Sequence, residues 1–429
     1  MQPLRVGIAG LGTVGAGTAK LLATHRALLQ RRTGRDIVVT AVSARDRDKD
    51  RGLDLAAVRW HDDARSLAAD PAVDVVCELI GGSAGVALDL CRDALRRGKP
   101  VVTANKAMLA VHGLELAGLA EQAGVALCFE PAVAGGIPVV KSLREGLAAN
   151  RVERVYGILN GTCNYILTTM RESGRDFATV LGEAQALGYA EADPSFDVDG
   201  IDAAHKLALL ASLAFGGRPR FDAIHIEGIR HVSPLDIQFA AELGYRIKLL
   251  GVARLTEGGL EQRMHPCMVP VDAPIAAVEG VFNGVVVDGD FVGNVVHEGR
   301  GAGAGPTASA VVADLIDIAR GSRVPAFGVP AGQLADHPIV PIAERRGSYY
   351  IRLLVVDRPG VLADVSAILR DHEVSIEALI QRGRNPDQPV PIVLTTHDTQ
   401  EGRMAGALAA IAALDSCLEP PRMIRIEQL

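Results

Sequence analysis

The sequence lacks the features that mark several large classes of protein. It has no basic excess, because 44 lysines and arginines stand against 51 aspartates and glutamates, a net charge of −7. This balance argues against a nucleic-acid-binding or anionic-membrane surface, since both require basic residues. No apolar run reaches the roughly 18 residues of a membrane span, and no signal peptide is visible at the start. We therefore expect neither nucleic acid nor membrane as a partner.

Cysteine is scarce as well. Six cysteines are scattered through 429 residues without a Cys-x-x-Cys pair. Such spacing indicates reduced core residues and argues against a disulfide framework or a zinc site, so we expect a cytoplasmic protein. With 48% hydrophobic and 22% charged residues, the composition is that of an ordinary globular protein. At roughly 150 residues per domain, the length suggests about three domains.

Lysine is rare among the basic residues. Only seven of the 44 are lysine, and the others are arginine. Arginine keeps its proton in proteins, whereas a buried lysine can release it. Each lysine that the chain retains is therefore a candidate for acid–base chemistry. The seven are residues 20, 49, 99, 106, 141, 206 and 248.

The first part of the chain alternates short apolar runs with helix-like segments. Runs typical of buried parallel strands lie at residues 5–9, 37–42, 73–79, 101–103 and 125–129. Strands that alternate with helices predict an α/β fold, here a Rossmann-type doubly wound sheet over residues 1–134.

The pattern changes from about residue 135. Longer helical stretches, strand-like runs and a helix at 306–320 predict an α+β domain over residues 135–323. A proline-rich stretch suggests a linker at 324–348. Residues 349–429 follow the order strand, helix, strand, strand, helix, strand, which is that of a ferredoxin-like βαββαβ module.

A glycine-rich turn follows the first predicted strand and opens the first predicted helix. It reads Gly10-Leu11-Gly12-Thr13-Val14-Gly15. The first glycine allows a tight turn, the second lets the backbone approach a pyrophosphate, and the third lets the helix pack closely. The helix N-terminus then faces the anion. The turn predicts dinucleotide binding; the alternative is a glycine-rich turn in a flavodoxin-like sheet.

The choice of nicotinamide cofactor depends on the end of the second strand. An acidic residue there would hold a ribose 2′-OH, and an arginine would accommodate a 2′-phosphate. Ser43 and Arg45 suit a phosphate, whereas Asp46 suits a hydroxyl. The pattern favours NADP and leaves NAD open. Arg45 is otherwise a solvated loop charge.

Two further segments carry residues suited to chemistry. Residues 101–106 end a parallel strand at the edge where such sheets bind ligands, so we expect Thr103 and Lys106 beside the cofactor. Residues 188–206 are rich in carboxylates, and Asp202 and Lys206 share one helix face. The apolar residues after Lys206 place it in the core, where desolvation would lower its pKa toward the working pH. The alternative is an acidic helix start at the surface.

Several separated motifs together resemble homoserine dehydrogenase. They are GLGTVG at 10–15, NGTCNYIL at 160–167, GYAEADP…D…GIDAAHK at 188–206 and GAG…PTASAVVADL near 301–315. That family interconverts L-aspartate 4-semialdehyde and L-homoserine with a nicotinamide cofactor, on the route to threonine, methionine and isoleucine. The resemblance implies that residues 135–323 form a catalytic and dimerisation domain.

The resemblance also implies roles for single residues. Lys206 matches the lysine that exchanges a proton with the substrate oxygen, and Lys106 matches a second lysine near nicotinamide and substrate. Glu191 and Asp202 match the substrate-binding acids, with Asp202 also part of the catalytic group. The glycines that match cofactor contacts are Gly188 and Gly303.

A monovalent-cation site follows from the same resemblance, with sodium as the expected ion. It is built partly from backbone carbonyls of the segment at residues 130–138. The matching positions are Glu130, Val133, Gly135 and Ile137.

The C-terminal module resembles an ACT domain, a ferredoxin-like module that commonly binds amino acids in pairs. Its first predicted strand is followed by Asp357-Arg358-Pro359-Gly360-Val361-Leu362. This loop and the free N–H groups of the next helix start can receive a carboxylate, which makes Asp357, Gly360, Val361 and Leu362 the expected effector residues. The family implies L-threonine as feedback inhibitor. Because such modules pair through exposed edge strands, we expect a homodimer or homotetramer.

Two other functions fit parts of this pattern. One is a related Rossmann oxidoreductase that acts on another small amino-acid aldehyde. The other is an amino-acid sensor without catalysis, against which the retained Lys206, Asp202 and Glu191 speak.

Overall fold

The computed structural model describes residues 2–382 and 389–429. Its N-terminal part is a parallel sheet in the order β3-β2-β1-β4-β5-β6, the order of a dinucleotide-binding Rossmann fold. The strands are β1 (Leu4–Ala9), β2 (Ile37–Ser43), β3 (Arg59–His61), β4 (Val75–Glu78), β5 (Val101–Thr103) and β6 (Leu127–Cys128). The helices are α1 (Thr13–Thr24), α2 (Arg26–Thr33), α3 (Ser66–Ala69), α4 (Val86–Arg96) and α5 (Lys106–Ala123). The predicted doubly wound sheet is confirmed, and β3 is an additional strand.

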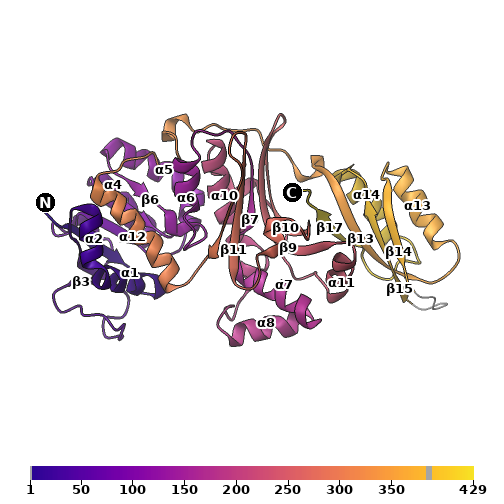
Figure 1. Cartoon of the computed structure of the whole chain (residues 1–429), viewed down its shortest axis with the longest axis horizontal. Helices are drawn as coiled ribbons and strands as arrows, with labels where there is room; N and C mark the ends of the chain where they lie inside the picture. Colours follow the sequence, from indigo (N-terminus) through magenta and orange to yellow (C-terminus); the bar gives the residue numbers. More distant parts are fainter. Residues whose placement is uncertain (1, 383–388) are drawn as a thin grey trace.

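Helix α12 (Ala304–Arg320) lies far along the chain but returns to this first domain. In Figure 1 the orange α12 lies among the indigo and purple elements. Its apolar face contributes Val311, Val312 and Leu315 to the same core cluster as Leu22 of α1. The Rossmann domain is therefore built from two separate stretches of sequence, which the predicted boundary near residue 134 does not describe.

The middle of the molecule is a largely antiparallel sheet with helices against it (Figure 1). Its strands are β7 (Val152–Ile158), β8 (His225–Ile226), β9 (Tyr245–Thr256), β10 (Gly259–Pro270), β11 (Phe282–Gly289) and β12 (Gly293–Arg300). The α-helices of this part are α6 (Val139–Lys141), α7 (Gly161–Ser173), α8 (Phe177–Ala186), α9 (Ser195–Val198), α10 (Ile201–Phe215) and α11 (Pro234–Glu242). Helix α10 is buried along most of its length, as its apolar spacing predicts.

The C-terminal part has the predicted βαββαβ order. It comprises β13 (Arg346–Val356), α13 (Val361–Asp371), β14 (Ile376–Gln381), β15 (Pro389–Thr396), the short β16 (Thr399–Gln400), α14 (Glu401–Ala412) and β17 (Arg422–Ile426). Strand β17 pairs with β13 and also runs parallel to β10 at Cys267 and Met268. The central sheet and the C-terminal sheet are therefore one continuous sheet.

Two expectations about the whole chain can be compared with this structure. All six cysteines lie in its described part and are free, and five of them are buried. Among the described residues, no helix is both long and apolar enough to cross a membrane.

Candidate active site

A cavity of about 630 Å³ opens where the Rossmann domain meets the central domain. It is lined by residues from the glycine-rich turn, the start of α5, the start of α7, the loop before α9, helix α10 and the turn before α12. Sequence-predicted residues that line it are Thr13, Val14, Lys106, Gly135, Gly188, Glu191, Asp202, Lys206 and Gly303. The fold thus gathers residues from distant segments around one space.

Asp202 lies between two lysines in this cavity. The Nζ of Lys206 donates to Asp202 Oδ2 at 2.7 Å, and the Nζ of Lys106 lies 3.1 Å from Asp202 Oδ1. Lys206 also donates to the carbonyl oxygen of Leu159 at 2.8 Å, and its side chain is 12% exposed. Burial by itself would raise the pKa of Asp202, but the two ammonium groups outweigh it and lower the pKa below its usual range.

Asn160 ties this group to helix α7. Its Oδ1 accepts the backbone N–H of Cys163 and caps the helix, while its Nδ2 donates to Asp202 Oδ2 at 2.9 Å and to Asp197 Oδ1 at 2.8 Å. Burial raises the pKa of Asp197; the bond from Asn160 opposes this rise, and the nearby charge of Asp202 adds to it. Asn160 and Asp197 are functional candidates that the sequence reasoning did not single out, although both lie inside the quoted motifs.

The glycine-rich turn has the geometry that a dinucleotide requires. Gly10 has a φ of +94°, and a Cβ there would lie 2.5 Å from the carbonyl oxygen of Leu79. A Cβ on Gly15 would lie 1.9 Å from the carbonyl oxygen of Gly10, whereas a Cβ on Gly12 would meet no atom within 4 Å. The first and third glycines thus permit close packing, and the second leaves open space beside the start of α1, so the turn fits a pyrophosphate.

The loop after β2 contains the residues that bear on cofactor choice. The Oδ1 of Asp46 accepts the N–H groups of Asp48 and Lys49, at 3.0 and 3.1 Å, within its own loop. Arg45 is exposed. The Nε of Arg51 donates to the carbonyl oxygen of Leu11 at 3.1 Å, which joins this loop to the glycine-rich turn. Asp46 therefore has a local structural role, in a loop that also contains Arg45, Arg47 and Arg51.

Glu191 and Thr103, both predicted site residues, differ in whether their side chains face the cavity. Glu191 is exposed at the cavity and makes no side-chain hydrogen bond within the described residues. The hydroxyl of Thr103 instead points into the protein, where it donates to Glu78 Oε2 at 2.6 Å and accepts the N–H of Asn105. Only the backbone of Thr103 is left for a cofactor.

The segment predicted to hold a cation borders the same cavity. The carboxylate of Glu130 accepts the N–H groups of Val140 and Lys141, at 3.0 and 2.8 Å. Burial, together with the charge of Asp314, raises the pKa of Glu130 to about 7. Each carboxylate oxygen of Glu130 thus accepts one backbone N–H, and the carbonyl oxygen of Ile137 accepts the N–H of Val139 at 2.8 Å. The other predicted positions of this segment are Val133, which is buried, and Gly135, which lines the cavity. Hard monovalent cations accept backbone carbonyl oxygens as ligands.

The predicted effector residues lie in the C-terminal domain and do not line the cavity. Gly360, with a φ of +98°, is the N-cap of α13. Asp357 is half-buried, Val361 is buried and Leu362 is exposed.

Comparison with known proteins identifies the family. Residues 10–130 match the homoserine dehydrogenase NAD binding domain, residues 138–316 match homoserine dehydrogenase, and residues 349–416 match the ACT domain. Homoserine dehydrogenases of Pseudomonas aeruginosa and Neisseria gonorrhoeae are 50% and 48% identical, over 100% of each chain. The chain belongs to the homoserine dehydrogenase family. It is an NAD(P)-dependent oxidoreductase of amino-acid biosynthesis with a C-terminal ACT domain.

Solved structures agree with this assignment. The crystal structure of a homoserine dehydrogenase from Thiobacillus denitrificans has a TM-score of 0.94 and 47% identity, and the match covers 99% of this chain and 98% of that chain. A hyperthermophilic archaeal homoserine dehydrogenase in complex with NADPH has a TM-score of 0.62 and 28% identity, over 74% of this chain and 97% of that chain. The fold class is therefore confirmed, including its ACT domain.

Proposed function

We propose that the enzyme interconverts L-homoserine and L-aspartate 4-semialdehyde in this cavity, with Lys206 as the acid–base group. The placement of Asp202 between Lys106 and Lys206, in a cavity shared with the glycine-rich turn, carries this proposal. The nicotinamide, when bound, supplies or accepts the hydride. The chain's own residues must then manage the proton of the substrate oxygen and the charges of the substrate.

Lys206 is suited to transfer that proton. An ammonium has three donors, and Asp202 and the Leu159 carbonyl use two of them. The third remains for the substrate oxygen. When Lys206 releases its proton to a new alkoxide, Lys106 still balances the charge of Asp202. The pair of lysines thus keeps one positive charge on the carboxylate throughout the transfer.

The substrate ammonium needs a carboxylate that is not already neutralised. Asp202 faces two lysines, whereas the side chain of Glu191 has no charged partner within the described residues. We therefore assign the ammonium to Glu191 and give Asp202 the role of holding the lysines. Glu191→Gln should lower kcat/KM at least tenfold, about 1.4 kcal/mol, and an unchanged value would return Glu191 to the role of a surface acid.

We infer NADP as the preferred cofactor, because the loop after β2 contains Arg45, Arg47 and Arg51, while Asp46 is bonded within the same loop. The archaeal relative in complex with NADPH supports a nicotinamide cofactor with this phosphate. Arg45→Ala should raise the KM for NADP about tenfold or more and leave the KM for NAD unchanged. Equal effects on both cofactors would remove Arg45 from phosphate recognition.

We infer a cytoplasmic location for the enzyme.

We also infer a sodium ion held by carbonyls of residues 130–137. To test for the cation, activity should be compared in sodium chloride and in choline chloride at equal ionic strength. Higher activity or a higher melting temperature in sodium alone is the expected result. Identical behaviour in the two salts would remove the cation from the proposal.

We infer that L-threonine inhibits the enzyme through paired ACT domains in a homodimer or homotetramer. The helix start after Gly360 can receive its carboxylate. Gly360→Val should weaken inhibition, because a side chain is strained at this φ and crowds the approach. Threonine titration of activity tests this. If millimolar threonine and the other aspartate-family amino acids leave activity unchanged, the module has only a structural role.

The reaction itself is tested by absorbance at 340 nm with homoserine and either cofactor. Turnover is the expected result and excludes a sensor without catalysis. Competing small alcohols and amino-acid aldehydes test the alternative oxidoreductase. A preference for one of them over homoserine and its semialdehyde would overturn the proposed substrate.

A further inference from the structure

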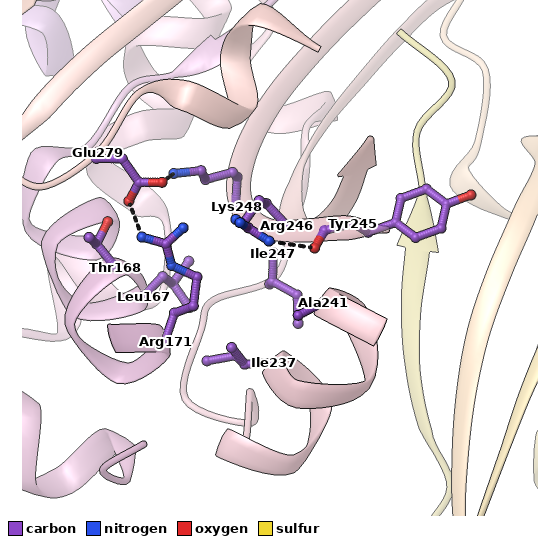
Figure 2. A pocket seen from close by; sticks show the side chains of 10 residues that line it. All are labelled: Leu167, Thr168, Arg171, Ile237, Ala241, Tyr245, Arg246, Ile247, Lys248 and Glu279. Atoms are coloured by element: carbon purple, nitrogen blue, oxygen red, sulfur yellow. Dashed lines mark hydrogen bonds and ion pairs between the residues drawn. The ribbon is translucent and has the colours of Figure 1, made fainter. Parts of the chain in front are cut away.

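One of the seven lysines is buried outside the active-site cavity and has no role in the proton transfer. Lys248 on β9 is 3% exposed. Its Nζ donates to the carbonyl oxygen of Val278 at 2.5 Å and to Asn164 Oδ1 at 3.3 Å, and lies 3.6 Å from Glu279 Oε1. Figure 2 shows the carboxylate of Glu279 joined to both Lys248 and Arg171. Burial lowers the pKa of Lys248 to about 8, against the attraction of Glu279. A buried lysine ammonium is costly, and this chain has only seven lysines. Lys248 is therefore expected to have a specific role.

Lys248 holds a short segment, residues 278–283, against helix α7. Asn164 donates to the carbonyl oxygens of Val278 and Phe282, both at 3.1 Å. The hydroxyl of Thr168 accepts the N–H of Gly280 at 3.1 Å. The start of the same helix is capped by Asn160, which bonds Asp202. Helix α7 thus joins the catalytic carboxylate to the segment that Lys248 fixes.

The segment ends in Asn283, at the wall of the active-site cavity. Asn283 is 2% exposed and lines the cavity, and its amide makes no hydrogen bond within residues 2–382 and 389–429. It is packed against Gly301, where a Cβ would lie 2.3 Å from Asn283 Cγ. The amide reaches the open space of the cavity, where a bound ligand or water can satisfy it. The side chain is therefore poised for a bound molecule.

The amino-acid substrate has a group that still needs such a donor. Lys106 and Lys206 are paired with Asp202, Asn160 is bonded to two carboxylates, and Glu191 repels an anion. Arg300 also lines the cavity but is exposed. Two buried side chains at the wall, Asn283 and Thr307, have donors without a partner in the described residues. Thr307 lies in α12, which packs on the Rossmann domain, whereas Asn283 lies in β11 of the domain that carries Asp202 and Lys206.

We propose that Nδ2 of Asn283 binds the α-carboxylate of the substrate, and that Lys248 is a positioning residue that keeps Asn283 at the cavity wall. This inference rests on the proposed function, since it assigns a further contact in the same reaction. It also explains the buried lysine: its ammonium bridges β9, α7 and the segment that carries Asn283.

The first experiment measures steady-state kinetics of homoserine oxidation for Asn283→Ala and Asn283→Asp. We expect the KM for homoserine to rise at least tenfold in both and further in the aspartate variant, which places a second carboxylate beside that of the substrate. The KM for the cofactor should change less than twofold. As a second readout, wild-type enzyme should prefer homoserine over its carboxamide, and Asn283→Asp should reduce this preference at least tenfold.

A double-mutant cycle then tests whether Lys248 acts through Asn283. Lys248→Met should also raise the KM for homoserine several-fold, and the double variant should be no worse than Asn283→Ala, because the anchor has no further effect once the amide is gone. Lys99→Met is the matched control: this lysine also donates to backbone carbonyls, at Leu67 and Asp70, but in the Rossmann domain. It should leave the KM for homoserine unchanged. If Lys248→Met does not fold, Thr168→Val removes another anchor of the same segment and replaces it in the cycle.

Three results would overturn the inference. An altered KM for the cofactor with an unchanged preference for homoserine over its carboxamide would place Asn283 against the nicotinamide. An unchanged KM for homoserine in both Asn283 variants would remove the contact. Additive effects in the cycle would show that Lys248 acts independently of Asn283. Absence of turnover in the wild-type enzyme would instead count against the proposed function itself.

Discussion

At the scale of single residues, the active site depends on charges that compensate one another in a buried space. Asp202 is ionised because Lys206 and Lys106 outweigh the cost of its burial. Each lysine is in turn held by the carboxylate. The arrangement holds a proton donor at a fixed place. The two ammonium groups and the carboxylate together carry a net charge of only +1.

Substitution of Lys206 tests the acid–base assignment. Lys206→Ala should lose nearly all turnover, and Lys206→Arg should be nearly inactive too, because guanidinium does not release its proton at usable pH. Both should still bind NADPH, measured by fluorescence. An arginine variant that kept more than about a tenth of the wild-type kcat, a barrier change under ~1.4 kcal/mol, would mean that another group moves the proton.

Glu130 predicts a pH dependence of stability. Its folded pKa, about 7, lies above the ordinary value of 4.5. The folded state therefore binds this proton more tightly than the unfolded state does. The bound proton adds to the free energy of unfolding at acid pH, and this contribution is lost as the pH rises from 4.5 through 7. The loss is on the order of 3 kcal/mol once the pH is well above 7.

Melting temperatures of wild type and Glu130→Gln across pH 4.5–8 measure this effect. The glutamine variant does not titrate, so the wild type should lose stability relative to it as pH rises over this window. A constant difference between the two proteins across the window would show that folding does not raise the pKa of Glu130.

At the scale of elements, the crossing of α1 and α12 shapes the cofactor site. A Cβ on Gly17 of α1 would lie 2.8 Å from the carbonyl oxygen of Ala304, the first residue of α12. The absence of a side chain therefore allows the two helix starts to approach. Thr13 at the start of α1 and Gly303 before α12 both line the cavity, so the separation of these helices sets its width.

Gly17→Ala should push the two helices apart. We expect a loss of stability of about 1–3 kcal/mol, as in other overpacked contacts, together with weaker NADPH binding by fluorescence titration. Gly118→Ala in α5 is the control, since a Cβ there meets no atom within 4 Å. It should stabilise the protein by up to about 1 kcal/mol. Equal NADPH affinity in both variants would show that the contact between α1 and α12 does not affect cofactor binding.

At the scale of the whole molecule, one sheet connects the catalytic part to the ACT domain. At the junction, Glu427 accepts hydrogen bonds from Arg263 of β10 and from Arg345 just before β13, and all three side chains are buried. A change in the ACT domain can therefore reach β10 through strand pairing and through this charge network. Truncation before the ACT domain would expose the edge of β10, so single substitutions are the sharper test.

Glu427→Gln should destabilise the protein strongly, because it leaves two buried arginines short of a countercharge. Breaking such a buried pair costs roughly 3–5 kcal/mol, measured here by denaturant or thermal unfolding. The control is Asp398→Asn, which removes the partner of Arg346 in an exposed pair and should change stability by less than about 1 kcal/mol. Similar small effects in both variants would mean that the junction does not depend on its charges.

The sequence by itself determined the elements and the local motifs of this enzyme. The alternation of strands and helices, the glycine-rich turn, the buried helix α10 and the βαββαβ order of the C-terminal domain are all present in the structure. These features depend on residues close together in the chain, whose periodicity and turn chemistry report local conformation directly.

Only the tertiary structure decided which distant residues meet. Nothing local to residues 304–320 indicates that α12 packs on α1, or that β17 joins two domains into one sheet. The contact of Asp202 with Lys106 and the place of the Asn283 amide at the cavity wall likewise arise from segments far apart in sequence. The physical reason is that long-range packing is chosen by the burial of complementary surfaces over the whole molecule, to which any short stretch of sequence contributes only one side.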